Sequence, residues 1–117
     1  MTTDTHFSHK VWHDTSPAVG KAKFPLVGDP THTLTNNFGV HIPEEGLALR
    51  GTFVINPEGI IKTAEVHSNE IARDVKETLR KLKAAVYTAA HPNEVCPAKW
   101  NEGDKTIAPS FDLVGKI

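Results

Sequence analysis

The single cysteine of this 117-residue chain, Cys96, is its best candidate for redox or nucleophilic chemistry. It stands between Pro92 and Pro97, after the longest helical pattern and before a tail that contains Gly, Pro and Ser. A thiol in such a segment is accessible and able to move, which suits disulfide chemistry with a partner group from elsewhere. A lone cysteine is also commonly a small buried hydrophobe, and that interpretation stays open at this point.

The seven histidines are the other candidates for chemistry. His6, His9 and His13 fall on one face of a predicted helix, where imidazole nitrogens suit zinc or nickel. No cysteine or carboxylate from a second element has the spacing to complete such a site, so we expect a solvated face without metal. His91 precedes Cys96, but no third residue is placed to orient it as a base, so a cysteine protease is a remote alternative.

The first part of the chain predicts short elements. Asp4 or Thr5 caps a helix whose apolar residues form one stripe. Residues 24–28 resemble a brief strand. Asp29 and the proline after it predict the start of a second helix, because a carboxylate cap followed by proline is a common helix opening. Gly39 is placed to end that helix.

A hairpin is the clearest sheet signal. Residues 51–55 form a continuous β-favouring run of the kind found in a fully covered central strand. Residues 56–59 are a turn with proline second and glycine fourth, and residues 60–66 are the returning strand. The preceding residues, 41–49, have no periodicity and are expected to form a loop.

A long amphipathic helix is predicted next, capped by Ser68 or Asn69 and ending near Ala90. Its apolar positions are Ile71, Val75, Leu79, Leu82 and Val86. Trp100, beyond this helix, is expected to anchor the tail. These elements predict an α/β layer. The hairpin gives the central strand a neighbour on one edge only, so the chain reads as if it began partway through a fold.

Length and composition limit the class of protein. A chain of 117 residues fits one domain, and a net charge of −1 argues against a nucleic-acid partner. No apolar run approaches the roughly 20 residues that span a bilayer, so we expect no membrane partner. The N-terminus lacks the pattern of a signal peptide. One cysteine excludes an internal disulfide, so a reducing cytoplasm is the expected compartment.

Short strings along essentially the whole chain resemble the typical 2-Cys peroxiredoxins in order and spacing, and most closely the peroxidase components of bacterial alkyl hydroperoxide reductases. The strings are residues 3–7, 28–30, 50–55, 56–61, 73–74, 94–100 and 113–117. The resemblance implies a partial thioredoxin-like α/β sandwich that uses thiols and needs no cofactor or metal.

The chain also departs from the family pattern. The family's peroxidatic cysteine, which attacks peroxide, ends a Pro-x-x-x-Thr/Ser-x-x-Cys motif. Ala89 and Asn93 occupy the two defining positions before Cys96, so the resemblance implies that Cys96 is the resolving cysteine. The chain therefore looks like a C-terminal part of the family's domain. Residues 1–90 would belong to the thioredoxin-like fold without its N-terminal βαβ part, and residues 91–117 would form the tail.

Two arginines are candidates for an active site. Arg50 stands at the head of the predicted central strand, where a guanidinium can stabilise a thiolate and donate hydrogen bonds to a peroxide oxygen. Taken alone it is a surface arginine at a strand end, but the resemblance implies the family's active-site arginine. Arg73 matches a second family arginine that supports the first, and a helix-surface ion pair explains it equally well.

The resemblance implies a peroxidase that reduces hydrogen peroxide and organic hydroperoxides, of which this chain carries the resolving half. It implies a homodimer, with a ring of dimers as a larger assembly, and a flavoprotein disulfide reductase or thioredoxin-like protein as reductant. In the family the tail reaches across the dimer, so Cys96 would serve the other subunit. The alternative is a non-catalytic assembly module that dimerises through the hairpin and modulates an intact homologue.

Overall fold

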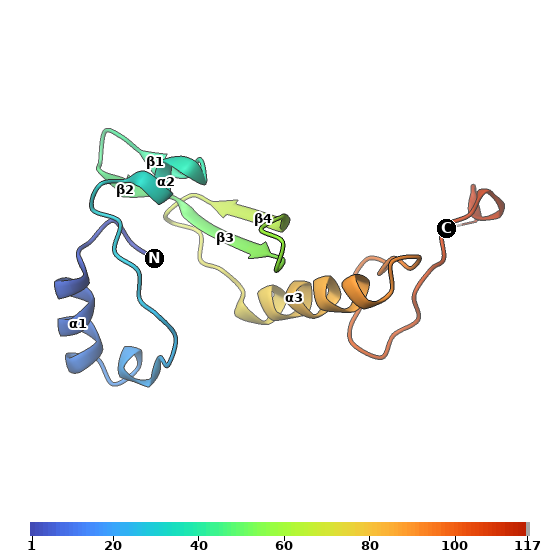
Figure 1. Cartoon of the computed structure of the whole chain (residues 1–117), viewed down its shortest axis with the longest axis horizontal. Coiled ribbons are helices and arrows are strands. Elements are labelled where there is room, and N and C mark those ends of the chain that lie inside the picture. The colour runs from blue at the N-terminus through green and yellow to red at the C-terminus, as the bar shows by residue number, and fades with distance from the viewer. Residues whose placement is uncertain (117) are drawn as a thin grey trace. The chain divides into compact units, whose positions relative to one another are not determined.

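A computed structural model describes residues 1–116 (Figure 1). The chain divides into two compact units. The first contains Met1–Gly51 and Val66–Ala72, and the second contains Thr52–Glu65 and the chain from Arg73 onward. Ile117, the last residue of the predicted tail, lies outside the described residues.

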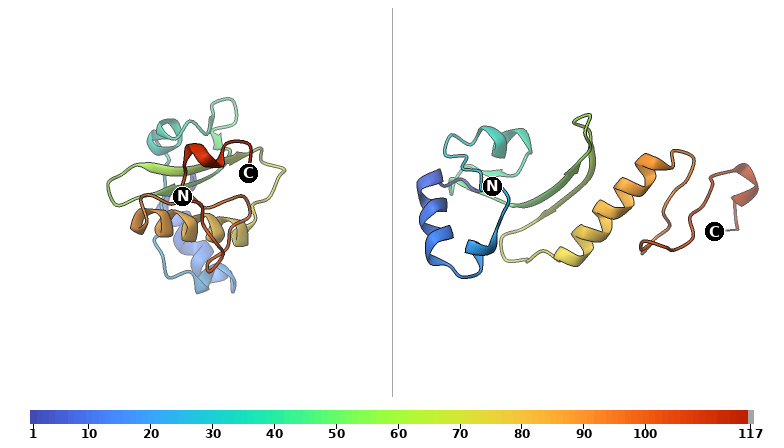
Figure 2. Two further views of the ribbon diagram at one scale, coloured as in Figure 1. Left: turned by 90° about the vertical axis from the view of Figure 1, so that its right-hand side faces the viewer. Right: turned by 60° about the horizontal axis from the view of Figure 1, so that its bottom comes forward.

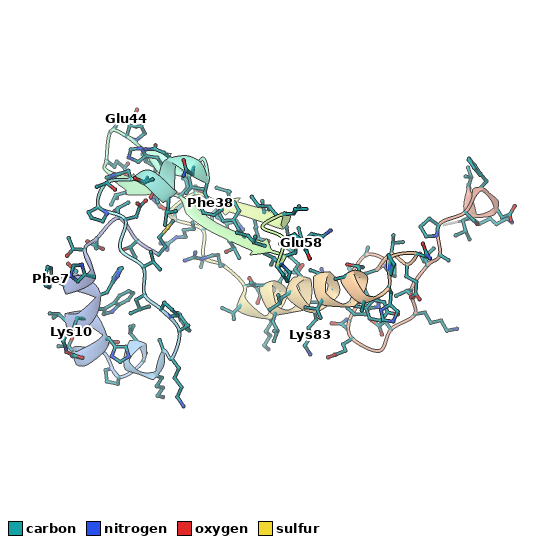
Figure 3. The ribbon with its side chains drawn as sticks, in the orientation of Figure 1. Phe7, Lys10, Phe38, Glu44, Glu58 and Lys83 are labelled. Atoms are coloured by element: carbon teal, nitrogen blue, oxygen red, sulfur yellow. The ribbon has the colours of Figure 1, made fainter. Side chains whose placement is uncertain are left out.

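The first helix, α1 (His6–Thr15), begins at its predicted cap. The Thr5 hydroxyl accepts a hydrogen bond from the Ser8 amide over 3.5 Å, as an N-cap does. The predicted apolar stripe lies on this helix but faces solvent, since Phe7 is 71% exposed. Figure 3 shows Phe7 and Lys10 projecting from α1. The apolar stripe of α1 is therefore not part of a core within this chain.

Within residues 1–116, the strand predicted at 24–28 does not form. Its backbone makes an isolated parallel bridge between Thr2 and Gly28. The Thr2 amide donates to the Val27 carbonyl over 3.0 Å, and the Asp29 amide donates to the Thr2 carbonyl over 2.8 Å. The segment thus pairs with the N-terminus at a single position, which is too little for a strand.

The helix predicted from Asp29 begins later, as α2 (Thr33–Asn37), so Pro30 is not its first residue. Although Asp29 lies before the helix, its side chain still accepts hydrogen bonds from the first turn of α2. Its carboxylate accepts from the Leu34 amide at 3.2 Å, and from the Thr35 amide at 2.7 Å and hydroxyl at 2.6 Å. The Thr35 hydroxyl is the main cause of a lowered pKa of Asp29.

The loop predicted at residues 41–49 is wrong. β1 (His41–Ile42) and β2 (Leu47–Ala48) form a small antiparallel hairpin. Gly46 adopts a left-handed φ of 65° in its turn, a conformation that glycine reaches without strain. Strands of two residues show no alternation of apolar and polar side chains, so the sequence pattern does not reveal them.

The predicted central hairpin is present as β3 (Arg50–Ile55) and β4 (Ile61–His67). Its turn closes as predicted, with the Gly59 amide donating to the Asn56 carbonyl over 2.9 Å. Figure 3 places Glu58 at the tip of this hairpin. The expectation of a fully covered central strand is wrong for the described chain. There β3 and β4 form a two-stranded sheet, and the residues of β3 are half-buried or exposed.

The long helix, α3 (Val75–Ala90), begins later than predicted. Its N-cap is Asp74, whose carboxylate accepts a hydrogen bond from the Lys76 amide over 2.8 Å. The predicted caps Ser68 and Asn69 therefore lie before the helix, in the connection from β4. The apolar periodicity identified the helix itself but not its first turn.

The apolar side of α3 faces solvent. Its side chains are between 44% and 78% exposed at Val75, Leu79, Leu82 and Val86. Among residues 1–116, the hydrophobic side chains that are fully buried are Val40 in the first unit and Trp100 in the second. The prediction that Trp100 anchors the tail is thus confirmed.

After α3 the chain folds back as the Cys96 segment (residues 91–107), shown in orange and red in Figure 2. An antiparallel bridge between Val95 and Ile107 closes it, through backbone hydrogen bonds of 2.9 and 3.0 Å. Short 3-10 helices are η1 (Val19–Lys21) in the first unit and η2 (Phe111–Leu113) after the segment. No helix of residues 1–116 is both long enough and apolar enough to cross a lipid bilayer.

Candidate functional site

Cys96 lies on a loop that a buried tryptophan fixes to α3. Trp100 is 2% exposed, and its indole Nε1 donates to the Asp104 carbonyl over 3.0 Å. Its ring packs against the ring of Tyr87 on α3, with centroids 5.1 Å apart. The thiol of Cys96 is free and half-buried. The interpretation of Cys96 as a fully buried hydrophobe is therefore wrong.

A carboxylate close to Cys96 joins the segment to the helix. Glu94 accepts hydrogen bonds from the Tyr87 hydroxyl on α3, over 2.8 Å, and from the hydroxyl of Thr106, near the end of the Cys96 segment. These bonds, the one from Thr106 first, lower the pKa of Glu94. The contact with Glu94 also raises the pKa of Tyr87. The geometry therefore favours an ionised Glu94 facing two hydroxyl donors.

Arg80 makes a second polar tie between α3 and the segment. Its Nη1 donates to the Trp100 carbonyl over 2.9 Å, while Nε and Nη2 hold the Glu77 carboxylate at 2.6 and 2.8 Å. This two-pronged pair lowers the pKa of Glu77 and raises that of Arg80. Lys83, labelled in Figure 3, adds an ion pair with Glu102 at 2.6 Å. Arg80 and Tyr87 thus hold the segment to α3, whereas an ion pair as exposed as that of Lys83 and Glu102 contributes little.

A shallow pocket of about 300 Å³ opens beside Cys96 within the second unit. Its cationic lining residues are Lys62, Arg80, Lys81 and Lys99. The described residues that line it include no carboxylate, although Lys81 forms an ion pair with Glu65. Two of the four cationic side chains beside the thiol are therefore neutralised, Arg80 by Glu77 and Lys81 by Glu65.

The two candidate arginines lie in different units. Arg50, the first residue of β3, belongs to the first unit and is exposed, and its Nε donates to the Asn69 carbonyl over 2.6 Å. Arg73 belongs to the second unit and directly precedes the N-cap Asp74 of α3. The pocket with Cys96 is lined by later turns of that helix, so the structure does not bring Arg73 and Cys96 together.

The histidine side of α1 differs from the solvated face that the sequence predicts. His9 is only 5% exposed, and its Nε2 lies 2.7 Å from the Thr2 hydroxyl. The Nε2 of His13 donates to the Ala22 carbonyl over 3.3 Å. The N-terminal residues and the chain after α1 therefore engage this side of the helix. Within the described chain, no group of three His, Cys, Asp or Glu side chains is arranged to hold a metal ion.

The first half of the chain decides the family. The family model described as AhpC/TSA matches residues 1–64, more than half of the chain. The chain belongs to the AhpC/TSA family. A second model, described as the C-terminal domain of 1-Cys peroxiredoxin, matches residues 86–116, which include Cys96.

Curated relatives are similar over the whole chain. Alkyl hydroperoxide reductase C of Pseudomonas aeruginosa (strain UCBPP-PA14) is 86% identical over 117 residues. Alkyl hydroperoxide reductase C of Escherichia coli (strain K12) is 56% identical over the same residues. The chain spans 63% of the length of each of these relatives.

Solved structures agree with this assignment. The crystal structure of Enterococcus faecalis AhpC has a TM-score of 0.78 and 40% identity, covering 82% of this chain and 57% of that one. Reduced 2-Cys peroxiredoxin of Plasmodium vivax has a TM-score of 0.86 and 28% identity, covering 95% and 58%. The predicted peroxiredoxin resemblance and the partial peroxiredoxin fold are confirmed. So is the correspondence of the chain to a C-terminal portion of such proteins.

The sequence did not point to three residues of this site, Arg80, Tyr87 and Glu94. One signal was available, because Arg80 and Tyr87 are about two helical turns apart and so share one side of the predicted helix. Glu94 gives no such signal. Its two partners come from a helix and from an irregular arm, and no periodicity links them.

Proposed function

We propose that this protein is a 2-Cys peroxiredoxin, the peroxidase component of an alkyl hydroperoxide reductase, and that Cys96 is its resolving cysteine. Its relatives carry the name alkyl hydroperoxide reductase C. The observation that carries the proposal is a free, half-buried thiol on a segment held to α3 by a few side-chain contacts. A resolving thiol must leave its resting place, because a disulfide needs Cα atoms within about 7 Å of each other.

The proposed chemistry has two thiol steps. A peroxidatic thiolate elsewhere in the whole enzyme attacks the O–O bond of a hydroperoxide, becomes a sulfenic acid and releases water or an alcohol. The Cys96 thiolate then attacks the sulfenic sulfur, and the S–O bond breaks as the oxygen leaves in water. A flavoprotein disulfide reductase or a thioredoxin-like protein supplies the electrons that return the disulfide to two thiols.

Arg50 is the proposed active-site arginine. Its bond to the Asn69 carbonyl supports this role, since it restrains a guanidinium that must hold a thiolate and a peroxide oxygen. Arg73 is proposed to support it. We place the enzyme in the cytoplasm as a homodimer that assembles into a ring, with Cys96 serving the partner subunit's site.

The test uses a full-length homologue whose own resolving cysteine has been changed to serine. This homologue is mixed with the purified chain, treated with one equivalent of hydrogen peroxide, and analysed by mass spectrometry without reduction. We expect a mixed disulfide through Cys96, and none with the matched Cys96→Ser chain. A sulfenic acid that forms and persists in a stable complex with the wild-type chain would contradict the resolving role.

The alternative, a non-catalytic assembly module, is favoured by one observation. The apolar side of α3 is exposed, with Val75 at 78% and Val86 at 64%, and such a surface is covered either by another protein or by the part of the family's domain that this chain does not span. In the same mixing experiment, association without a Cys96 disulfide and with a changed turnover of an intact homologue would support this alternative.

A further inference from the structure

The Cys96 thiol lies between two anchors of different kinds. On one side Glu94 contacts α3 through its carboxylate, and on the other Trp100 is buried. Lys99, next to Trp100, has a left-handed φ of 63°, which is strained for a residue with a side chain. The loop that carries Cys96 is therefore held at both ends in a conformation with stored strain.

Glu94 is the junction of three parts of the second unit. Its carboxylate accepts hydrogen bonds from Tyr87 on α3 and from Thr106 near the end of the Cys96 segment. Directly beside it, Val95 and Ile107 exchange their two backbone hydrogen bonds. Hydrogen bonds to an ionised acceptor are stronger than bonds between neutral groups. Loss of the carboxylate therefore weakens the contact with the helix and the bridge together.

The Trp100 anchor depends on other groups. Its indole is buried and bonded to the Asp104 carbonyl, and its own carbonyl accepts from Arg80. None of these contacts uses the Glu94 carboxylate, although the ring of Tyr87, whose hydroxyl donates to Glu94, also packs against the indole. Loss of the hydrogen bonds to Glu94 can therefore free the part of the segment that carries Cys96 while Trp100 stays in place.

We propose that Glu94 is a positioning residue for disulfide formation, whose carboxylate clasps the Cys96 segment to α3 and whose release frees Cys96. The bonds from Tyr87 and Thr106 then set the fraction of time for which the thiol can leave its resting place. The role in resolution rests on the proposed function. The clasp itself is a property of this chain and is measured without peroxide or a partner protein.

Hydrogen exchange of the full chain tests the clasp. In Glu94→Ala, the amides of Val95 and Ile107 should exchange at least about tenfold faster, since two bonds to a carboxylate are lost. Glu94→Gln keeps a neutral carbonyl acceptor and should recover only part of the protection, because the stronger bonds to an ionised acceptor are lost. Glu102→Ala is the matched control, because it removes a glutamate of the same segment that pairs with the exposed Lys83. It should leave both amides unchanged.

Alkylation of Cys96 by neutral iodoacetamide gives a second readout. The rate should increase several-fold in Glu94→Ala and in Tyr87→Phe, and remain at the wild-type value in Glu102→Ala. Unchanged exchange and alkylation in Glu94→Ala would overturn the proposal. Faster exchange spread equally over residues 81–83 of α3 would also overturn it, because Glu94 would then be a general stabiliser. Failure of the proposed function would appear separately, as the absence of a mixed disulfide while these results stand.

Discussion

Arg80 donates a hydrogen bond from Nη1 to the carbonyl oxygen of Trp100 over 2.9 Å, and this bond ties the middle of α3 to the residue that anchors the Cys96 segment. The same guanidinium holds Glu77 in a two-pronged pair. An arginine can make both contacts at once because its five N–H donors lie in one plane and point in different directions. The site of the thiol thus depends on a side chain of the helix that does not itself take part in thiol chemistry.

Replacing Arg80 should loosen the Trp100 anchor. A lysine offers a single ammonium and cannot hold Glu77 with two prongs while donating to the Trp100 carbonyl. We expect Arg80→Lys to shift tryptophan emission to longer wavelength, measured in a Trp12→Phe background, and to speed Cys96 alkylation several-fold. Lys83→Ala, which removes an exposed ion pair nearby, serves as the control and should change neither. Equal effects of both variants would contradict the specific role of Arg80.

The chain alone should show no peroxidase turnover. A resolving thiol lacks the pocket that activates a peroxidatic thiolate, so its reaction with peroxide should match that of free cysteine. The measurement is hydrogen peroxide consumption by the purified chain with a thiol reductant. Consumption far above that of free cysteine, and abolished by Cys96→Ser, would disprove this expectation.

β4 should provide a dimer edge. It is the last strand in the chain order, and in the described residues its sheet has only two strands, so one of its edges is open to pair with a second copy. Proline removes a ladder donor, and neighbouring amides of a strand point to opposite edges. Ala64→Pro and Thr63→Pro should therefore differ, with one dissociating the dimer and the other disturbing the hairpin. Light scattering reports the mass, and an unchanged dimer in both variants would refute the edge.

Arg50→Lys should slow peroxide reduction and spare resolution in an enzyme that contains the whole family domain. Lysine keeps the charge but loses the planar fork that can hold a thiolate and a peroxide oxygen together. Loss of one such preorganised donor typically costs about a hundredfold in rate. Stopped-flow measurements should show a slower first phase and an unchanged disulfide-forming phase. An unchanged first phase would leave Arg50 as a surface residue at a strand end.

Acid should release the Cys96 segment through Glu94. The pKa of Glu94 is lowered in the docked segment by the Thr106 and Tyr87 hydroxyls, with a further contribution from His91. A carboxyl with a depressed pKa stabilises the docked state above its ordinary pKa, and this stabilisation is lost as pH falls through the lowered value. The amide NMR signals of Val95 and Ile107, which form the bridge beside Glu94, should therefore report release that begins near the ordinary value of 4.5 and proceeds at lower pH.

Glu94→Gln is the control for this pH effect. The pKa of Glu77 is also lowered, by its pair with Arg80, so the difference between the wild-type and Glu94→Gln curves isolates the contribution of Glu94. Identical curves would show that the segment is not held by this carboxylate. A release that occurs on raising the pH through the same range would contradict the sign of the argument.

Local signals in the sequence predicted much of the secondary structure. The Thr5 cap and the turn at residues 56–59 formed as expected, because each depends on neighbours within a few positions. The start of α3 was wrong because Asp74 offers a carboxylate to the first free amides, and this outweighed the apolar periodicity that extends back to Ile71. Periodicity alone does not report which of several polar residues will cap.

Contacts between segments distant in sequence were not predictable in this way. The burial of His9 results from the N-terminal residue Thr2, and nothing in the spacing of the histidines signals that neighbour. At the candidate site, the sequence identified Cys96 as the thiol and Trp100 as the anchor of its segment. It did not identify Glu94, because that residue matters only through two hydroxyls that the fold brings to it.

The bridge between Val95 and Ile107 closes the loop that carries Cys96, so force on the residues after Ile107 acts on the thiol's surroundings. Residues 96–106 are enclosed by this bridge, so tension applied beyond Ile107 is borne first by its two backbone bonds and by the contact between Thr106 and Glu94. Those bonds would break in succession, and the contacts of Trp100 would bear the force only after they have broken. Anything that grips residues 108–116, whether a neighbouring protomer or an affinity tag, is therefore mechanically coupled to the exposure of Cys96.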